Sequence, residues 1–243
     1  MHKIKSATLF FLLIVVLCTI CNQTDAQRYK KNKYNLEIID NINDYKHETD
    51  KNNSAKLVPL LDFIPHLKTD FVYATVHNFT HTALYKNPRA YALLPTAQAL
   101  KKAANILKKK DLGIILFDAY RPYAVTEKMW EIEPDPRYAA DPKLGSGHNR
   151  GIALDISLYK LSNGKLLKMP TGFDDFSDTA HSDYMNLDKE IIGNRQLLKT
   201  VMESCGFEQL STEWWHFYIP NPNNQYKIIN LSFDTLNKYT IYN

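Results

Sequence analysis

One short segment of the chain combines residue types that bind metal ions. His148 lies in a loop that has glycine at positions 145, 147 and 151, and Asp155 follows seven residues later inside a predicted strand. An aspartate is disfavoured in a strand, and it is costly among aliphatic neighbours unless it is paired or bound to a cation. A histidine in a loop is, by itself, more often a surface residue than a ligand. Together, His148 and Asp155 predict half of a metal site.

A second segment, Glu213-Trp214-Trp215-His216, can supply the other half. Taken alone, His216 could be a hydrogen-bonded core residue and Glu213 a solvated charge. Residues three apart on an ideal strand point to opposite faces, so Glu213 and His216 meet only if a bend or bulge intervenes. We therefore expect Glu213 to lie before the strand proper and His216 to lie one step inside it.

These residues match the ligand set of a catalytic zinc site. Two histidines and one carboxylate, here His148, Asp155 and His216, leave a fourth position for water. Glu213, which is outside the ligand set, is then the candidate general base. The sequence has no His-Glu-x-x-His motif, which excludes a thermolysin-type site.

Arg121 is a candidate electrophilic group. It lies where a predicted strand gives way to a turn, between Tyr120 and Pro122. A fixed guanidinium could hold a carboxylate by two hydrogen bonds or stabilise a developing oxyanion. A purely structural ion pair with Asp118 is the alternative interpretation.

The apolar pattern predicts the elements that must position these residues. Helices are expected over 96–110, through 125–132 and over 189–205, and strands over 113–117, 152–158 and 213–219. In the strand 152–158 the aliphatic residues at even positions face one way, whereas Asp155 and Ser157 face the other. Helices and strands alternate irregularly, so we expect an α+β fold in which helices flank a small antiparallel sheet that carries the zinc site.

The first residues have the pattern of a secretory signal. Two lysines precede an apolar stretch over 7–21, and small residues follow, the last of them Ala26. We expect a signal peptide over 1–26 that is cleaved after Ala26, and hence an exported, periplasmic protein without stable membrane insertion. An uncleaved anchor and lipid attachment at Cys18 or Cys21 are the alternatives.

The rest of the chain is expected to form one linker and one domain. Residues 27–56 are polar and rich in lysine and asparagine, which predicts a linker or mobile arm with at most one short ordered piece at 36–39. The compact domain is expected over 57–243. After signal cleavage Cys205 is the single cysteine, so an internal disulfide is excluded.

The overall composition excludes several classes of protein. Of the 243 residues 44% are hydrophobic, which is too many for a chain disordered throughout, and 8 glycines are too few for a collagen-like chain. The formal net charge of +4 is too small to suggest a nucleic-acid binder.

Four motifs occur in the order found in the VanX-type D-alanyl-D-alanine dipeptidases, a family of zinc enzymes. They are Tyr73-Ala74-Thr75 together with Asn78-Phe79-Thr80, the segment 117–122, the segment 145–155 and the segment 213–217. The resemblance covers about 57 to 220. The sequence departs from the family at His81, where glycine is expected, and at Asn149, where serine is commoner; both are expected at the rim of the pocket.

The resemblance implies a role for each candidate residue. One zinc ion per chain would be bound by His148, Asp155 and His216, Glu213 would be the base, and Arg121 would steady the transition state. Four further residues resemble positions that confine a small dipeptide substrate in the family: Tyr73, Asp118, Ser146 and Asp174.

The expected reaction is therefore zinc-dependent hydrolysis of D-alanyl-D-alanine or a similar small D,D-dipeptide by an activated water. One alternative keeps this chemistry and changes the substrate, as in a carboxypeptidase or endopeptidase that trims peptidoglycan stem peptides. Another is a cell-wall-binding module that retains a structural zinc, although a base such as Glu213 has no use in pure binding. The sequence leaves the oligomeric state open.

Overall fold

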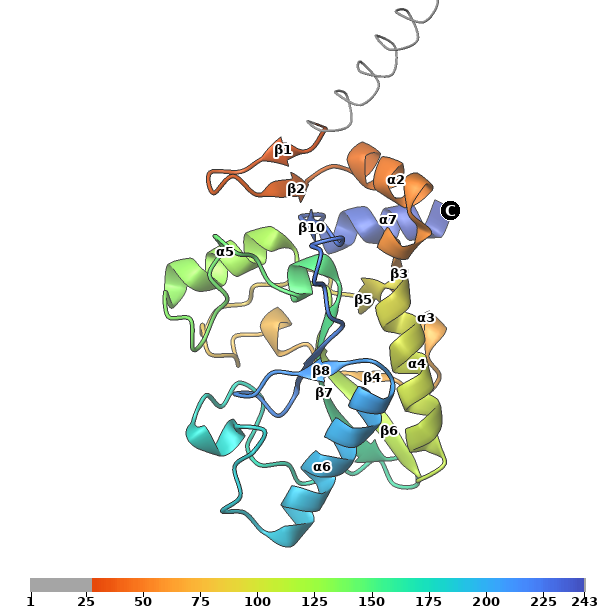
Figure 1. Ribbon diagram of the computed structural model, residues 1–243, viewed down its shortest axis with the longest axis vertical. Helices are drawn as coiled ribbons and strands as arrows, with labels where there is room; N and C mark the ends of the chain where they lie inside the picture. The colour runs from red at the N-terminus through yellow and green to blue at the C-terminus, as the bar shows by residue number, and fades with distance from the viewer. Residues whose placement is uncertain (1–27, 243) are drawn as a thin grey trace, which may run out of the picture.

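Five strands form the central sheet, in the order β4-β6-β7-β9-β8 (Figure 1). The structure is a computed structural model that describes residues 28–242. The strands are Lys68–Thr69 (β4), Leu112–Asp118 (β6), Ala153–Lys160 (β7), His216–Tyr218 (β9) and Glu208–Gln209 (β8). Neighbours pair antiparallel, except that β4 runs parallel to β6. The expected α+β fold with a small, mainly antiparallel sheet is confirmed.

The two faces of β7 have different partners, as the alternating pattern predicts. Leu154 and Ile156 belong to a buried cluster with residues of α4 (Leu94–Lys108) and α6 (Lys189–Ser204), the helices that cover one face of the sheet (Figure 1). Asp155 and Ser157 point to the other face, where each lines a cavity. The strand is therefore buried on both sides, and its polar residues mark the functional side.

Local signals set the ends of the helices. Pro95 occupies the first turn of α4, where its missing N–H costs nothing, and Asp111 takes a left-handed conformation shortly after the helix ends. Gly206, at φ +97°, follows α6 in the same way. The third expected helix is α5 (Tyr123–Ile132). All three expected helices are confirmed, and each observed end lies within two residues of the expected one.

The segment expected as a linker is instead part of the folded body. It contains β1 (Lys30–Lys31), β2 (Glu37–Ile39) and α2 (Ile42–Lys51), the last capped by the side chain of Asn41. Strand β2 pairs with β1 and with β10 (Ile228–Ile229) in a second sheet.

This corrects the expected domain start at residue 57. Ile39 and Tyr45 are each 1% exposed and share a hydrophobic cluster with residues near the other end of the chain, among them Leu236 of α7 (Phe233–Tyr242). The few apolar residues between the lysines and asparagines find their partners about 190 residues away, so local composition could not reveal them.

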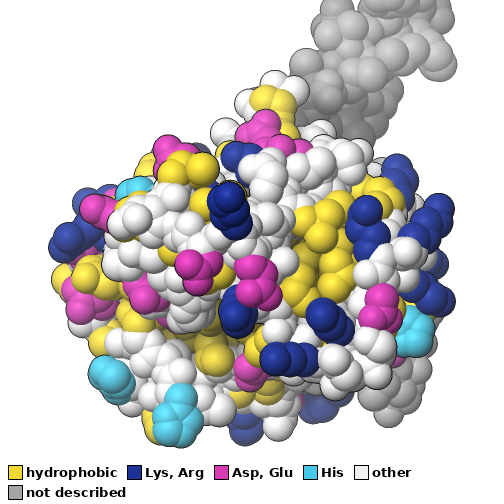
Figure 2. Space-filling model, turned by 90° about the horizontal axis from the view of Figure 1, so that it is seen from below, with side chains coloured by type: hydrophobic (Ala, Val, Ile, Leu, Met, Phe, Trp, Pro, Cys, Tyr) yellow, Lys and Arg dark blue, Asp and Glu magenta, His cyan; other side chains and the backbone are white. Residues whose placement is uncertain are grey.

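The remaining elements are short. They are η1 (Asn53–Ala55), β3 (Leu57–Pro59), α3 (Leu60–Phe63), η2 (Val72–Ala74), β5 (Tyr91–Leu93), η3 (His148–Arg150) and η4 (Asp178–Ala180), of which β3 and β5 pair as a two-stranded sheet. Figure 2 shows basic and acidic side chains interspersed on the lower face, with hydrophobic side chains in hollows between them.

Within residues 28–242, no helix combines the length and the apolar character that crossing a bilayer requires. The expected signal peptide lies outside the described residues.

Candidate metal centre

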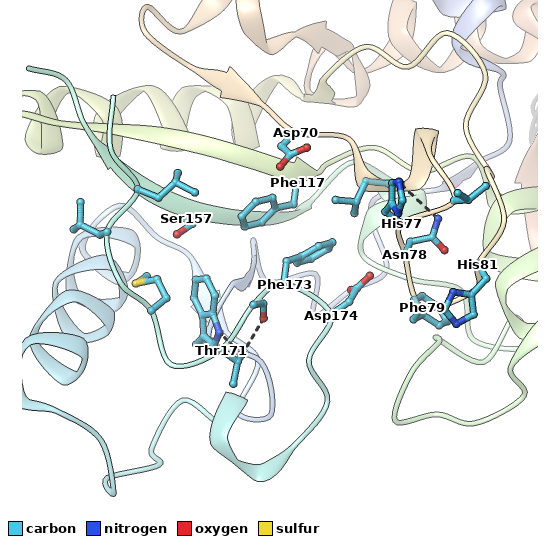
Figure 3. A pocket seen from close by; sticks show the side chains of 17 residues that line it. Asp70, His77, Asn78, Phe79, His81, Phe117, Ser157, Thr171, Phe173 and Asp174 are labelled. Atoms are coloured by element: carbon cyan, nitrogen blue, oxygen red, sulfur yellow. Dashed lines mark hydrogen bonds between the residues drawn. The ribbon is translucent and has the colours of Figure 1, made fainter. Parts of the chain in front are cut away.

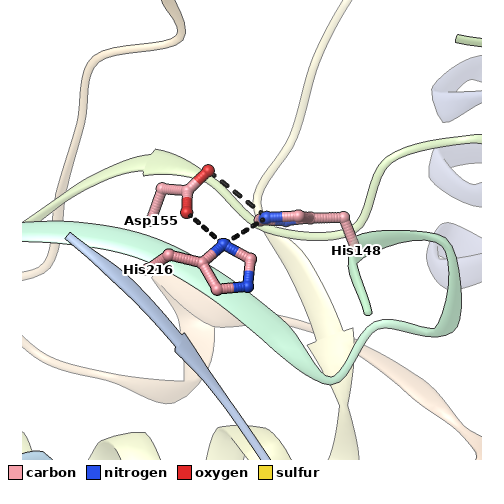
Figure 4. A group of neighbouring side chains, drawn as sticks. All are labelled: His148, Asp155 and His216. Atoms are coloured by element: carbon pink, nitrogen blue, oxygen red, sulfur yellow. Dashed lines mark hydrogen bonds and ion pairs between the residues drawn. The ribbon is translucent and has the colours of Figure 1, made fainter. Parts of the chain in front are cut away.

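Three side chains from separate segments converge at one point (Figure 4). His148 begins the short helix η3, Asp155 lies in β7, and His216 is the first residue of β9. Asp155 and His216 are directly opposite each other in the antiparallel pair of β7 and β9. His148 reaches them from the glycine-rich loop, because the left-handed turn at Gly151 reverses the chain between η3 and β7.

The distances within this group fit a tetrahedral metal site. His148 Nε2 lies 3.2 Å from His216 Nδ1 and 3.3 Å from an oxygen of Asp155, and His216 Nδ1 lies 2.9 Å from the other oxygen. Ligands 2.0–2.1 Å from zinc at tetrahedral angles are separated by about 3.3 Å. These distances involve two nitrogens and both oxygens of Asp155, and one ligand atom from each of the three residues can be chosen so that all lie within 4.8 Å of one another, close enough to bind one ion.

A backbone carbonyl selects the nitrogen of His148 that faces the metal position. His148 Nδ1 lies 2.8 Å from the oxygen of Ala119, so it carries the proton that this carbonyl accepts. Nε2 is then left with a lone pair, as a metal ligand requires. Metal-binding histidines commonly have this arrangement, which is further support for a metal centre here.

The buried charges of Asp155 and the two histidines shift one another's pKa values. Burial by itself would raise the pKa of Asp155, but His148 and His216 hold it well below its usual range. Burial by itself would lower the pKa of His216, but the hydrogen bond and charge of Asp155 raise it. A cation is therefore favoured between these side chains, whether it is a proton or a metal ion.

Glu213 lies beside the metal ligands and outside the strand. Its Oε2 is 3.8 Å from His216 Nδ1. The segment 213–215 forms a turn, and β9 begins only at His216, so the expected strand is confirmed only over His216–Tyr218. The bend expected between Glu213 and His216 is present. Burial raises the pKa of Glu213, partly offset by the charge of His216, which suits a group that exchanges protons.

Arg121 is held by a buried ion pair and still reaches the cavity. Its Nε and one terminal nitrogen donate to the same oxygen of Asp118, at 2.9 Å and 2.7 Å. The guanidinium carbon of Arg121 lies 5.2 Å from the centre of the Tyr73 ring. Arg121 also lines the cavity beside the metal group. Both interpretations from the sequence therefore apply to Arg121: it is paired with Asp118, and it faces the site.

Asp118 does not contact the cavity, which corrects its expected role in confining the substrate. Its side chain is fully buried, and its second oxygen accepts hydrogen bonds from the Tyr85 hydroxyl at 2.6 Å and from the Ala119 N–H at 2.9 Å. Both oxygens of Asp118 are thus occupied by hydrogen bonds within the protein, so the role of this carboxylate is to hold Arg121 in position. The sequence did not reveal Tyr85, because nothing in its local pattern indicates a partner 33 residues away.

Asn149 is likewise interior rather than at the rim. Its amide donates to the Arg121 carbonyl at 3.0 Å and to the Thr126 hydroxyl at 2.8 Å, and its oxygen accepts from the Ser146 N–H at 2.9 Å. These bonds join the metal loop, the Arg121 turn and helix α5. His81, the other departure from the family pattern, lines a different cavity.

The cavity at the metal group has a volume of about 260 Å³. Besides the metal ligands and Glu213, its lining includes three of the residues expected to confine a substrate, Tyr73, Ser146 and Asp174. The lining residues that were not anticipated from the sequence include Arg137, Tyr138, Phe176 and Leu210. They come from loops without a periodic pattern, so no local signal connected them to the site.

Asp174 is the most unusual residue of this lining. One of its oxygens accepts a hydrogen bond from the Tyr73 hydroxyl at 3.0 Å, and the other is buried without a partner. Burial raises the pKa of Asp174 well above its usual range, and the negative charge of Asp155 raises it further. Its backbone is left-handed, with φ 59°. A buried acceptor without a donor is suited to a ligand that brings one.

Comparison with known proteins agrees with this arrangement. A family model described as D-ala-D-ala dipeptidase matches residues 53–234. The D-alanyl-D-alanine dipeptidase of Escherichia coli (strain K12) is 34% identical over 168 residues, which are 69% of this chain and 86% of the relative. The D-alanyl-D-alanine dipeptidase of Enterococcus faecium is 30% identical over 190 residues, which are 68% of this chain and 94% of the relative.

Among solved structures, the LD-carboxypeptidase LdcB aligns with a TM-score of 0.42 at 16% identity, over 81% of this chain and 85% of that one. This likeness is too distant to support conclusions about the chain.

Proposed function

This chain belongs to the D-ala-D-ala dipeptidase family and is a metallopeptidase, and from that premise we propose that it hydrolyses D-alanyl-D-alanine or a similar small D,D-dipeptide. The proposal rests on the convergence of His148, Asp155, His216 and Glu213 at one cavity of about 260 Å³. That volume is below the roughly 300–1,000 Å³ of pockets for drug-sized ligands, so it suits a small substrate.

The proposed cofactor is one zinc ion per chain. His148 would bind it through Nε2, His216 through Nδ1, and Asp155 through a carboxylate oxygen. When bound, zinc polarises a carbonyl and lowers the pKa of a water towards about 7.

Glu213 is proposed as the general base. Its carboxylate lies close enough to the metal group to accept a proton from the attacking water and to return it to the leaving amine. Burial raises its pKa, which brings proton uptake and release closer to neutral pH. Arg121, fixed by Asp118, would donate hydrogen bonds to the oxyanion that develops on the peptide carbonyl.

Two polar groups of the lining are proposed to hold the ends of a zwitterionic dipeptide. The unpartnered oxygen of Asp174 would accept from the substrate ammonium, with Tyr73 fixing the other oxygen. The hydroxyl oxygen of Ser146 already accepts from the His148 N–H at 3.1 Å, which leaves its hydrogen free to donate to the substrate carboxylate.

Hydrolysis of D-alanyl-D-alanine by the purified protein tests the proposal. We expect release of D-alanine that stops after treatment with a chelator and returns when zinc is added, whereas L-alanyl-L-alanine is a poor substrate. A D,D-terminated pentapeptide assayed in parallel distinguishes a stem-peptide carboxypeptidase. Full zinc occupancy without hydrolysis of any of these peptides would instead indicate a binding module.

We also propose that the protein is exported, with residues 1–26 removed as a signal peptide. The proposal rests on the basic start, the apolar stretch and the small residues before Gln27. Mass spectrometry of the protein recovered from the periplasm checks it, since a mature N-terminus at Gln27 is expected and one at Met1 would contradict it.

A further inference from the structure

Two cavities outside the proposed active site are large enough to hold a ligand. The first, of about 630 Å³, has a lining of mixed character, in which the exposed side chains of Asp70, His77 and His81 accompany apolar ones (Figure 3). Its polar groups favour no single class of ligand. The second, of about 410 Å³, has mainly basic charged residues in its lining, and we call it the basic cavity.

The basic cavity lies where the second sheet meets the metal loop. Leu36 and Glu37, at the start of β2, and Ile228, at the start of β10, contribute from the sheet. Arg150, the last residue of η3, contributes from the metal loop. The basic cavity has no lining residue in common with the catalytic cavity, so it is a separate site.

Arg150 is half-buried and has no acidic partner in the part of the chain that the structure describes. An arginine removed from water is usually paired with an anion. The terminal nitrogens of Arg150 donate only to two loop carbonyls, those of Ser146 at 3.3 Å and Leu144 at 3.5 Å, which are long for hydrogen bonds. The remaining N–H groups are therefore available to an oxyanion, whose geometry matches the planar fork of a guanidinium.

Two lysines add to the positive charge of the basic cavity. Lys143 is exposed, and Lys227 is paired with Glu37 at 2.6 Å. Three basic residues against one carboxylate leave an excess of two positive charges on the lining. A phosphate monoester carries about 1.5 to 2 negative charges at pH 7, whereas a single carboxylate carries one. The charge of the lining therefore favours a phosphate group.

We propose that the basic cavity binds a phosphate group, either free or as the monoester of a small organic molecule. Arg150 donates paired hydrogen bonds to the phosphate, and Lys143 and Lys227 balance its second charge. The phosphate itself is small and fills only part of the cavity. The rest of the lining includes apolar side chains that suit the organic part of an ester: Leu36, Leu144, Tyr226 and Ile228.

Calorimetric titration of inorganic phosphate and of phenyl phosphate into the zinc-loaded protein at low ionic strength tests the proposal. We expect saturable binding that Arg150→Gln weakens by about tenfold or more, the usual effect of losing hydrogen bonds to a charged group. Lys143→Glu, at an exposed position, should weaken binding by about threefold or more. Phenyl phosphate should bind about tenfold more tightly than inorganic phosphate, because its ring buries apolar surface.

Arg89→Gln is the matched control. It removes the charge of an arginine that is paired with Asp62 and lies outside the basic cavity, so the affinity for phosphate should not change. Circular dichroism establishes that each variant is folded. Lys143→Glu carries the test if Arg150→Gln does not fold.

Absence of phosphate binding would overturn the proposal, and so would an affinity that the folded variants leave unchanged, as expected for phosphate bound only at the zinc ion. Tighter binding of phenyl phosphate identifies an organic monoester as the occupant, and equal affinities identify free phosphate; both results support the site. The hydrolysis of D-alanyl-D-alanine is measured independently, so the proposed function stands or fails separately.

Discussion

At the scale of single residues, Asp174 combines several costly features. It has a left-handed backbone, a buried oxygen without a partner and a raised pKa. Residues kept in such conformations cluster at functional sites, where the surrounding structure enforces them. Asparagine tolerates the left-handed region and cannot ionise, so Asp174→Asn isolates the cost of the charge.

The pH dependence of that cost has a definite sign. In the unfolded chain Asp174 ionises near pH 3.9. Folding raises its pKa, first through burial and then through the charge of Asp155, so the folded state loses stability as pH rises above that value. We expect metal-free Asp174→Asn to melt about 2–4 °C higher than the wild type at pH 7, a gain of roughly 1 kcal/mol, and to match it near pH 4. Thermal melts between pH 4 and 8 check this, with the exposed Asp175→Asn as control; a pH-independent difference would contradict it.

Glu213 and His216 are close together, yet we expect substitutions at these two residues to abolish activity for different reasons. Glu213→Gln keeps the metal ligands, so we expect normal zinc content and a fall in kcat on the order of 10²–10⁴, the usual contribution of a general base. His216→Ala removes a ligand, so we expect loss of zinc itself. Elemental analysis and steady-state kinetics separate the two effects, and Glu208→Gln, at the exposed position of strand β8, is the control. An active Glu213→Gln enzyme would refute the role of Glu213.

At the scale of elements, the metal loop depends on its attachment to a neighbouring strand. The carbonyl of Gly151 accepts the N–H of Leu93 at 2.8 Å, which fixes the loop to the end of β5. Gly151 has φ +66°, and a Cβ there would lie 2.7 Å from Leu57 Cδ2 and 3.1 Å from the Leu93 nitrogen. Neither the backbone conformation nor the available space admits a side chain at Gly151.

We therefore expect Gly151→Ala to destabilise the protein by at least about 1–2 kcal/mol, the cost of a left-handed residue that carries a Cβ. Displacement of the loop should also weaken zinc binding, because the loop carries His148. Gly193→Ala is the matched control: Gly193 lies in α6 with open space around its Cα, so alanine should stabilise the helix by about 0.5–1 kcal/mol. Urea denaturation measures both variants, and equal effects on stability would contradict this account of the loop.

At the scale of the whole molecule, the two ends of the described chain close over the same core. Tyr45 of α2 is 1% exposed, its ring meets that of Tyr239 in α7 at 5.7 Å, and its hydroxyl accepts the N–H of Leu57 at 2.7 Å. The hydroxyl of Tyr120, the residue before Arg121, donates a hydrogen bond to the Leu231 carbonyl and accepts one from the Leu231 N–H. Through these contacts the terminal segments support the turn that carries Arg121.

This arrangement predicts that the segment before residue 57 contributes to global stability. Tyr45→Phe leaves the buried N–H of Leu57 without its acceptor, so we expect the free energy of unfolding to fall by about 1–3 kcal/mol, with kcat/KM little changed. Asp50→Asn, on the exposed side of α2, should have no effect. Chemical denaturation monitored by tryptophan fluorescence checks both variants. Equal stability of Tyr45→Phe and the wild type would mean that the segment is only loosely attached, as a linker would be.

Local sequence was sufficient for features that depend on near neighbours. The alternation of aliphatic and polar residues placed Asp155 on the opposite face of its strand from Leu154 and Ile156, because side-chain direction reverses at every residue of a strand. The spacing of Glu213 and His216 required a bend, and the turn before β9 supplies it. The glycine-rich loop indicated that the chain bends to bring His148 to the metal position, and the left-handed conformation of Gly151 provides that bend.

Only the tertiary structure decided which distant groups share a partner. Asp118 became a support for Arg121 because Tyr85 occupies its second oxygen, and residues 30–51 became part of the core because β10 and α7 cover them. The ring of Phe173 is held in place because Tyr73, Phe117 and Trp215 surround it. The physical reason is the same in each case: residue type and spacing determine side-chain direction and local conformation, whereas burial, ion pairing and the shape of a cavity depend on atoms that the fold brings from elsewhere in the chain.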